Sequence, residues 1–174
     1  LGTFVEDVDG LLALLERTGT VISGSSALHL VQAKARSVGL RDMDIYATLE
    51  FEDEVMNHFK AAEGYKVTSK GGRKQGYDTS AVQKVCELDK EGKKVDIIIT
   101  DWPNVIMPVL QYHSTAVMNY ITAHSLVCLY PQWTKEKKSL VNPRMYLEDG
   151  TNVRGVMALM KYVRRGFQVT TEPF

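Results

Sequence analysis

Apolar residues recur at helical or alternating spacing along most of the chain, and this pattern predicts the order of its elements. In the first half we expect a helix over 5–17 ended by Gly19, a strand over 20–23, a break at Gly24 to Ser26, a helix over 27–35, a half-buried strand over 42–47 and a helix over 52–62. In the second half we expect strands over 65–69, 81–88 and 93–100 with a turn at 89–92, a short helix over 105–110, a segment of either type over 115–128, a helix after Pro131 that carries Lys135, Lys137 and Lys138, and a helix over 152–165 ended by Gly166.

The last of these helices is amphipathic by its spacing. Its predicted buried stripe consists of Val153, Val156, Leu159, Met160 and Val163. Helices and strands mix along the chain without strict alternation, so the expected fold class is α/β (α+β), a mixed β-sheet flanked by helices. A length of 174 residues fits a single domain over 1–174. We expect its core at about 1–130 and a C-terminal helical extension at about 131–174.

Charge and composition narrow the function classes. Lys plus Arg equals Asp plus Glu at 21 each, so the chain has no global field that would attract nucleic acid, and any polyanion must meet a local basic patch. The basic segment 70–74 is such a patch, although a solvated loop is the favoured interpretation. The two cysteines, Cys86 and Cys128, lie in apolar stretches and are expected to be free thiols.

The termini and hydropathy carry little information about location. No segment is long and apolar enough to span a bilayer, and the N-terminal residues lack the pattern of a secretory signal. We therefore expect a cytoplasmic or nuclear protein without membrane contact. The chain begins with Leu1 rather than Met, so a preceding segment could have been removed.

Two carboxylates in the strand over 42–47 are the first candidates for chemistry. Asp42 and Asp44 are two positions apart in a strand, so their side chains point to the same face with Cα atoms about 6.6 Å apart. Two like charges this close repel and favour a cation between them, and Mg²⁺ binds carboxylate oxygens together with substrate phosphates. The alternative without a metal is that both aspartates lie on a charged, solvent-exposed strand edge.

A third carboxylate interrupts the most β-prone run of the chain. Asp96 lies between Val95 and Ile97, and a charge in an apolar strand is expensive unless it has a partner or a function. On a neighbouring strand it would complete a two-metal site. Glu87 and Asp89 are weaker rivals for this place, and a solvent-facing position is the alternative for Asp96.

The Gly24-Ser25-Ser26 segment lies where a strand turns into a helix. Glycine there allows close approach of the backbone to a ligand, and amides at a helix N-terminus favour an anion such as phosphate. A phosphate site joined by one helix to a carboxylate pair suits a reaction of a nucleoside triphosphate.

Three stretches together carry a family resemblance. Ile22 to Leu28, then Asp42-Met43-Asp44, then Val95-Asp96-Ile97 resembles the signature of the DNA polymerase β-type nucleotidyltransferase superfamily. The Gly-Ser-Ser-Ala-Leu form, with Arg41 before the aspartate pair, is similar to the toxin-type and antibiotic-modifying branches. Residues 112–119 also resemble a group of uncharacterised fungal proteins of this superfamily.

The resemblance implies a nucleotidyltransferase-type fold and a role for each matching residue. Gly24, Ser25 and Ser26, with Arg41, would bind the triphosphate. The three aspartates would hold Mg²⁺ or Mn²⁺, and Asp96 would also help to deprotonate the attacking hydroxyl. The implied reaction moves a nucleoside monophosphate from an NTP to a hydroxyl on a small molecule, a protein or an RNA end, with pyrophosphate leaving.

Other functions remain open. The same fold could serve as a catalytically inactive module that binds a nucleotide or a protein, or as a phosphotransferase. The short C-terminal region leaves room for a partner chain or a homo-oligomer to complete the cleft. Ser114 and Thr115 could line a nucleotide pocket. Ser-His catalysis by His113 and Ser114 is disfavoured, because adjacent residues seldom face each other and no third partner is evident.

Overall fold

The computed structural model describes residues 1–32, 40, 42–71, 80–147 and 153–173. In chain order the first elements are α1 (Val8–Thr18), β1 (Val21–Ser23), α2 (Gly24–Val31), β2 (Asp42–Thr48), η1 (Leu49–Phe51), α3 (Glu52–Asn57), η2 (His58–Ala62), β3 (Lys66–Lys70), β4 (Lys84–Lys90) and β5 (Lys93–Thr100). They are followed by α4 (Ile106–Leu110), η3 (Thr115–Val117), β6 (Asn119–Ile121), β7 (Leu126–Cys128), α5 (Pro131–Lys135), β8 (Lys138–Leu140), α6 (Arg144–Leu147), α7 (Val153–Arg164) and β9 (Gln168–Thr170).

Seven strands form one mixed sheet in the order β3-β4-β5-β2-β1-β6-β7. Its central pair, β2 and β5, is parallel, and the other neighbours run antiparallel. The hairpin between β4 and β5 closes on Glu91 and Gly92, both with positive φ, which suits the right-handed twist of the two strands. The predicted mixed sheet with flanking helices is therefore confirmed.

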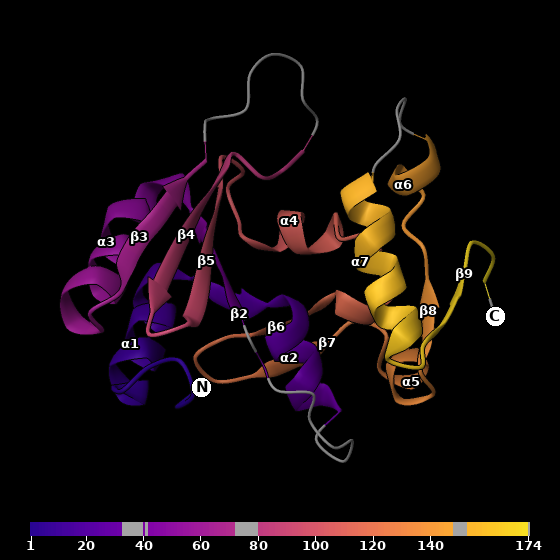
Figure 1. Ribbon diagram of the computed structural model, residues 1–174, viewed down its shortest axis with the longest axis horizontal. Coiled ribbons are helices and arrows are strands. Elements are labelled where there is room, and N and C mark those ends of the chain that lie inside the picture. Colours follow the sequence, from indigo (N-terminus) through magenta and orange to yellow (C-terminus); the bar gives the residue numbers. More distant parts are fainter. Residues whose placement is uncertain (33–39, 41, 72–79, 148–152, 174) are drawn as a thin grey trace.

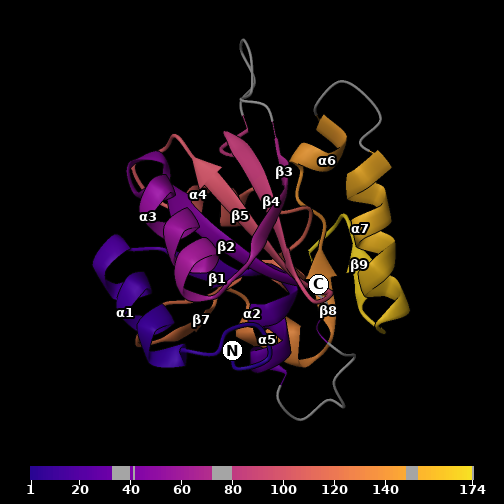
Figure 2. The ribbon, with the colours of Figure 1, turned by 60° about the vertical axis from the view of Figure 1, so that its left-hand side comes forward.

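One face of the sheet is buried under α1 and α3. Both helices lie on the same side of the strands, while α7 lies on the opposite side (Figures 1 and 2). The helices contribute apolar side chains such as Leu11, Leu14 and Phe59, each at most 1% exposed, to the main core. Alternate strand residues meet them, and these are Ile22, Met43, Ile45, Cys86, Leu88, Val95, Ile97 and Ile99. The period of two along each strand therefore leaves the other set of residues for the opposite face.

The opposite face is divided into an apolar part and a polar part. The apolar part lies near the C-terminal ends of β2 and β5. There a cluster joins the sheet to α4 and the residue before it, and its members are Val21, Tyr46, Ile98, Val105 and Val109. Toward the start of the same strands this face carries Asp42, Asp44, Lys94 and Asp96. This division places the carboxylates beside a packed core rather than on a free edge.

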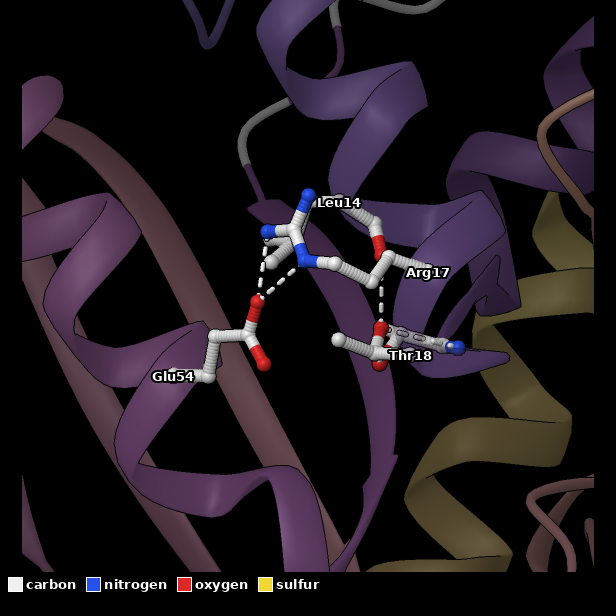
Figure 3. A network of polar contacts seen from close by, with 5 residues as sticks. Leu14, Arg17, Thr18 and Glu54 are labelled. Atoms are coloured by element: carbon white, nitrogen blue, oxygen red, sulfur yellow. Dashed lines mark hydrogen bonds and ion pairs between the residues drawn. The ribbon is translucent and has the colours of Figure 1, made fainter.

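Polar contacts join α1 to α3 at the end of the first helix. Arg17 Nε donates to Glu54 Oε1 at 2.6 Å, and the Thr18 hydroxyl donates to the Leu14 carbonyl at 2.7 Å (Figure 3). Gly19 ends the helix in the left-handed conformation with φ 64°, as its position in the sequence predicts. The Arg17–Glu54 pair is largely exposed and contributes little stability, whereas the Thr18 bond is buried.

The last third of the chain packs beside α2 through a small apolar cluster. Leu28 of α2 lies with Ala116 and Val117 of η3, Tyr162 of α7 and Phe167, all at most 4% exposed. Strands β8 and β9 form a separate two-stranded parallel sheet. The segment expected to be a helical extension thus contains a small sheet as well as helices α5, α6 and α7.

The structure differs from the sequence expectations at several elements. α2 begins directly at Gly24, with no break after β1. The helix after Pro131 ends at Lys135, because Lys137 adopts a positive φ of 55° and Lys138 begins β8, so its predicted extension through Lys138 was wrong. The segment over 115–128 forms a short 3₁₀ turn and a hairpin. Most of the basic loop over 70–76 lies outside the described residues.

The predicted buried stripe of α7 was also wrong in large part. Val153, Val156, Met160 and Val163 are between 42% and 62% exposed, whereas Tyr162 is 4% exposed and faces the protein. The helix carries apolar residues on two sides, so its spacing alone did not identify the inner one. Across the part of the chain that the structure describes, no helix has the length and hydropathy needed to cross a bilayer.

Candidate functional site

The site begins where β1 passes directly into α2. Ser23 is the last residue of the strand, and Gly24 opens the helix with φ +66°, a backbone conformation that glycine adopts without a steric penalty. A Cβ at Gly24 would overlap the Oδ2 atom of Asp44 and lie 3.0 Å from the Tyr112 hydroxyl oxygen. Glycine is therefore required both by the turn and by the close approach of a carboxylate.

The two serines after Gly24 contact the other aspartate of β2. The Ser25 hydroxyl donates to Asp42 Oδ1 at 3.3 Å, and the Ser26 hydroxyl donates to the Asp42 backbone carbonyl at 3.1 Å. Both serines are buried, at 7% and 5% exposed. The start of α2 is thereby attached to the strand that carries the aspartates, and the sequence placed these two segments together correctly.

Strand pairing puts the three predicted aspartates on one face. In the parallel pair of β2 and β5, Asp44 is in register with Asp96, and Asp42 lies two positions before Asp44 on the same face. In the antiparallel pair of β1 and β2, Ser23 is in register with Asp44. The expectation that Asp96 lies on a strand adjacent to the aspartate pair thus agrees with the pairing.

The weaker candidate Glu87 joins this face. It is in register with Asp96 in the antiparallel pair of β4 and β5. Asp89 is also on β4 and on the same face, in register with Lys94, which is itself in register with Asp42 and lies between the two carboxylates. Acidic side chains thus occupy three adjacent strands of the sheet.

The concentrated negative charge changes proton affinities. Burial raises the pKa of Asp44 to about 7, and repulsion from Asp42 and Asp96 adds to it, while Lys161 acts in the opposite direction. Burial also raises the pKa of Asp96, followed by repulsion from Glu87 and Asp42. Bringing these carboxylates together therefore opposes their ionisation, and a cation bound near them would favour it.

The residues that the structure describes include no group of three or more His, Cys, Asp or Glu side chains arranged to hold a metal ion. The three aspartates share a face and influence one another, yet their side chains do not form a ready ligand set. Their chemistry still suits a hard cation, because Mg²⁺ requires oxygen ligands and often binds through one or two carboxylates plus substrate phosphates.

Helix α7 brings basic and aromatic groups to the same face. Lys161 is close enough to Asp44 to lower its pKa, and Asp44 and Asp42 both raise the pKa of Tyr162, which burial, the largest cause, brings to about 12. The rings of Tyr162 and His113 lie 5.4 Å apart. Both views place α7 across from the sheet (Figures 1 and 2). The site thus has carboxylates on the sheet and a lysine on the facing helix.

Two tyrosines, Tyr46 and Tyr112, lie near Asp44. The hydroxyls of Tyr46 and Tyr112 are hydrogen-bonded to each other, and their rings meet edge to face at 6.0 Å between centroids. Burial, more than any charge, raises the pKa of both phenols, so they stay neutral at physiological pH. They separate the carboxylates from the apolar cluster around Val109.

The remaining sequence candidates have mixed outcomes. Arg41 lies outside the described residues. The Thr115 hydroxyl accepts a hydrogen bond from the Leu140 amide at 2.9 Å, which gives it a structural role. Ser114 is fully buried, and neither its hydroxyl nor His113 Nδ1 has a hydrogen-bond partner among the described residues, so the two do not form a nucleophile and base pair.

Sequence reasoning missed Tyr46, Tyr112, Lys161 and Tyr162. Tyr46 could have been predicted, because it follows Asp42 and Asp44 at a spacing of two residues and so shares their face of the strand. Tyr112 was quoted only as part of a resemblance, and its proximity to Gly24 arises from a fold contact between distant segments. Lys161 and Tyr162 lie on a helix whose inner face was misassigned.

Comparisons with known proteins identify the fold. No protein-family model and no curated protein sequence matches the chain. Among solved structures, the chain is similar to a tRNA nucleotidyltransferase complexed with a primer tRNA and an incoming ATP analogue, with a TM-score of 0.57 and 16% identity over 87% of this chain and 43% of that one. A tRNA-processing enzyme in its apo form matches with a TM-score of 0.58 and 17% identity over 87% of this chain and 39% of that one.

A CCA-adding enzyme in complex with CTP is also similar, with a TM-score of 0.54 and 13% identity over 94% of this chain and 39% of that one. The chain spans about two-fifths of the length of these structures. The nucleotidyltransferase-type fold implied by the sequence is thereby confirmed, whereas the likeness to fungal proteins has no sequence-level support.

Proposed function

We propose that this chain is a metal-dependent nucleotidyltransferase that moves a nucleoside monophosphate from an NTP to a hydroxyl group. The observation that carries the proposal is the register of Asp44 with Asp96, beside the Gly24 turn, in a fold shared with tRNA nucleotidyltransferases. The same fold also hosts other activities, so the function depends on the residues of the site and not on the fold alone.

Asp42, Asp44 and Asp96 are the residues that would hold Mg²⁺ or Mn²⁺. Burial, followed by repulsion among the carboxylates, raises the pKa of Asp44 and Asp96, so a cation would stabilise the ionised form of this face. When bound, the cation would stabilise the negative charge of the phosphates and lower the pKa of the attacking hydroxyl. The pairing of β2 and β5 holds Asp44 beside Asp96, and metal binding would require their side chains to rotate so that the oxygens converge.

Basic groups of α7 and the amides of α2 would bind the triphosphate. Lys161 is near enough to Asp44 to lower its pKa, and the N-terminus of α2 favours an anion at Gly24 and Ser25. Ser25 and Ser26 are engaged with Asp42, so their hydroxyls would primarily position that residue. Arg41 precedes β2 and remains a proposed phosphate ligand on the basis of the sequence resemblance.

The transfer step itself requires little covalent chemistry from the protein. The acceptor oxygen forms a bond to the α-phosphorus, the bond from that phosphorus to the bridging oxygen of the β-phosphate breaks, and pyrophosphate leaves. Asp96 would accept the proton of the attacking hydroxyl. Catalysis would come mainly from positioning.

The acceptor is the least defined part of the proposal. The structural neighbours include one complexed with primer tRNA, which makes an RNA 3′ hydroxyl the first acceptor to test. A small molecule or a protein hydroxyl would use the same site. The chain covers about two-fifths of these neighbours, so the acceptors that they use are only candidates for it.

Incubation with ATP labelled at either the α or the γ phosphate tests the reaction type. With Mg²⁺ and tRNA, a small-molecule pool or the protein itself as acceptor, nucleotidyl transfer places only the α label on the acceptor and releases labelled pyrophosphate from γ-labelled ATP. Transfer of the γ label instead identifies a phosphotransferase.

A catalytically inactive binding module is the second candidate. It is favoured by the lack of a ready three-ligand metal set among the described residues. Thermal unfolding with each NTP, with and without Mg²⁺, separates the two. The enzyme requires a metal-dependent gain in melting temperature that Asp96→Asn removes, whereas a metal-independent gain, or none, supports the module.

A further inference from the structure

Helix α7 has an exposed apolar stripe on the side that faces away from the protein. Its members are Val153, Val156, Met157, Met160 and Val163, with exposed fractions of 62%, 49%, 63%, 43% and 42%. Their spacing of three or four residues places them on one face of the helix. The inner face is separate, since Tyr162 is 4% exposed and packs with Phe167 and Leu28.

Leu147 extends this stripe. It is 74% exposed at the end of α6, and both views place α6 beside the N-terminal end of α7 (Figures 1 and 2). Single exposed apolar side chains are ordinary on a protein surface, but a continuous stripe on one helix face is typical of an interaction site. We call these six residues the α7 stripe.

The size of the α7 stripe matches one half of a homodimer interface. From its exposed fractions it presents on the order of 500 Å² of apolar surface. An interface of standard size buries about 800 Å² per partner, of which about 65% is apolar in homodimers. The stripe therefore supplies the apolar area that a stable dimer needs without any rearrangement of the fold.

The composition also favours a protein partner over a lipid surface. Methionine is enriched at protein interfaces and adapts its shape to a partner, whereas helices that lie in a membrane surface use Trp, Phe and Leu on the apolar side. Five of the six members of the α7 stripe are Val or Met, and Leu147 is the sixth.

Charge determines the relative direction of two copies. The sequence of α7 contains basic residues and no Asp or Glu, and Lys161 and Arg164 lie near its C-terminal end. Parallel packing would bring these cations together. Antiparallel packing about a two-fold axis near Ala158 and Leu159 separates the two Arg164 positions by about 16 Å along the axis, well beyond the Debye length of about 8 Å at physiological salt. It leaves only Arg164 of one copy near the sequence position of Arg154 of the other, whereas parallel packing would set every basic position of α7 against its own copy.

We propose that this chain forms a two-fold symmetric homodimer in which the α7 stripes of two copies pack antiparallel, with Met157 of each copy against Met160 of the other. Such an isologous contact closes on itself and gives a dimer rather than a filament. It would also hold α7 in place from its outer side, while Tyr162 on the inner side packs with Leu28 and Phe167. The dimer does not depend on the proposed reaction.

Light scattering after size exclusion, together with sedimentation equilibrium over a range of micromolar concentrations, tests the proposal. The chain should have twice the 19.5 kDa mass of one copy. Met157→Glu should raise the dimer dissociation constant about 30-fold or more, the loss typical of a central interface residue. Glu is a good helix former at this exposed position, so unchanged circular dichroism should accompany the loss.

Leu49→Glu is the matched control, because Leu49 is 41% exposed on η1 and lies outside the stripe. It should leave the dissociation constant unchanged. A monomeric chain at several hundred micromolar overturns the proposal, as does a dimer that is insensitive to Met157→Glu. Flotation of a monomeric chain with phosphatidylserine vesicles, abolished by Met157→Glu, would also overturn it by assigning the stripe to a membrane.

A mixed pair of variants tests the antiparallel register. Met157→Glu and Met160→Lys should each be monomeric alone and should form a mixed dimer when combined, because antiparallel packing brings position 157 beside position 160 of the other copy. Equal failure of the mixture and of the single variants, in a wild type that dimerises, would contradict this register.

Discussion

Gly24 and Asp44 are in contact at the junction of β1 and α2, and each constrains the other. The carboxylate occupies the space that a Cβ at position 24 would fill, and the backbone there has φ +66°. Because Asp44 is also in register with Asp96, a displacement of its carboxylate would change the whole acidic face.

Substitution of Gly24 by alanine should therefore damage the site more than the backbone strain alone explains. Gly19 is the matched control, since it has φ +64° and open space where a Cβ would be. Each alanine should lower the free energy of unfolding by about 1 kcal/mol through the left-handed backbone. Only Gly24→Ala should lose more than this and weaken metal-dependent NTP binding, as measured by urea denaturation and calorimetric titration. Equal behaviour of the two variants would contradict the contact.

Asp44 should also make the stability of the chain depend on pH. Its pKa is raised from 3.8 to about 7 in the folded state, so the folded chain binds more protons than the unfolded chain between these values. In metal-free buffer its contribution to stability is greatest below the unfolded pKa and is lost as the pH rises through about 7.

Asp44→Asn should remove this dependence. Above pH 7 the variant should be more stable than the wild type by about 4 kcal/mol, and near pH 4 the two should be nearly equal. Urea unfolding at a series of pH values in EDTA measures the difference. A constant difference across the series would show that the carboxylate titrates at its ordinary value.

The sequence was informative about these residues to different degrees. Asp42, Asp44 and Asp96 could be found because charge in a β-prone run is unusual and the period of two gives a side-chain direction. Tyr112 and Lys161 could not, because their place in the site arises from packing between segments far apart in the chain.

At the scale of elements, the position of α7 depends on its contacts with α2 and η3. Leu28 of α2 packs with Tyr162 and Phe167, and α2 begins at the Gly24 turn. A change in this cluster should therefore reach the site through α7, while a change on the other face of the sheet should not.

Leu28→Ala and Leu14→Ala form a matched pair for this purpose. Both side chains are buried, at 3% and 1% exposed, so each truncation should cost about 2–5 kcal/mol of stability. Leu28→Ala should in addition weaken NTP binding at temperatures where both variants remain folded. Equal NTP affinity of the two variants would argue against a role of α7 in the site.

The same helix explains why one element was misassigned from the sequence. Apolar residues occupy two sides of α7, and only tertiary packing decides that Tyr162 is inside while Met157 is outside. The strands β2 and β5 were located well, because β-branched runs and alternation leave a single buried face. Strands β8 and β9 were missed, since each has three residues and no distinctive pattern.

At the scale of the whole molecule, one face of the sheet forms the core and the other carries the proposed site. The face under α1 and α3 is continuously apolar, whereas the opposite face carries clustered carboxylates opposite α7. A cation bound to these carboxylates would offset their repulsion, and binding would require that they lose their protons.

Mg²⁺ should therefore stabilise the chain more at high pH than at low pH. With an NTP present, its addition should raise the melting temperature at pH 8 and have little effect at pH 5, where Asp44 is protonated. Differential scanning fluorimetry measures both conditions, and Asp96→Asn serves as the control without the full ligand set. A gain of equal size at both pH values would indicate a cation site elsewhere.

The most direct test of the metal and nucleotide site is anomalous X-ray scattering from crystals grown with Mn²⁺ and a non-hydrolysable ATP analogue. The account predicts a manganese peak bound by Asp44 and at least one of Asp42 and Asp96, with the triphosphate between the start of α2 and Lys161. A bound analogue whose manganese lies away from these carboxylates, or whose phosphates contact another surface, would contradict it.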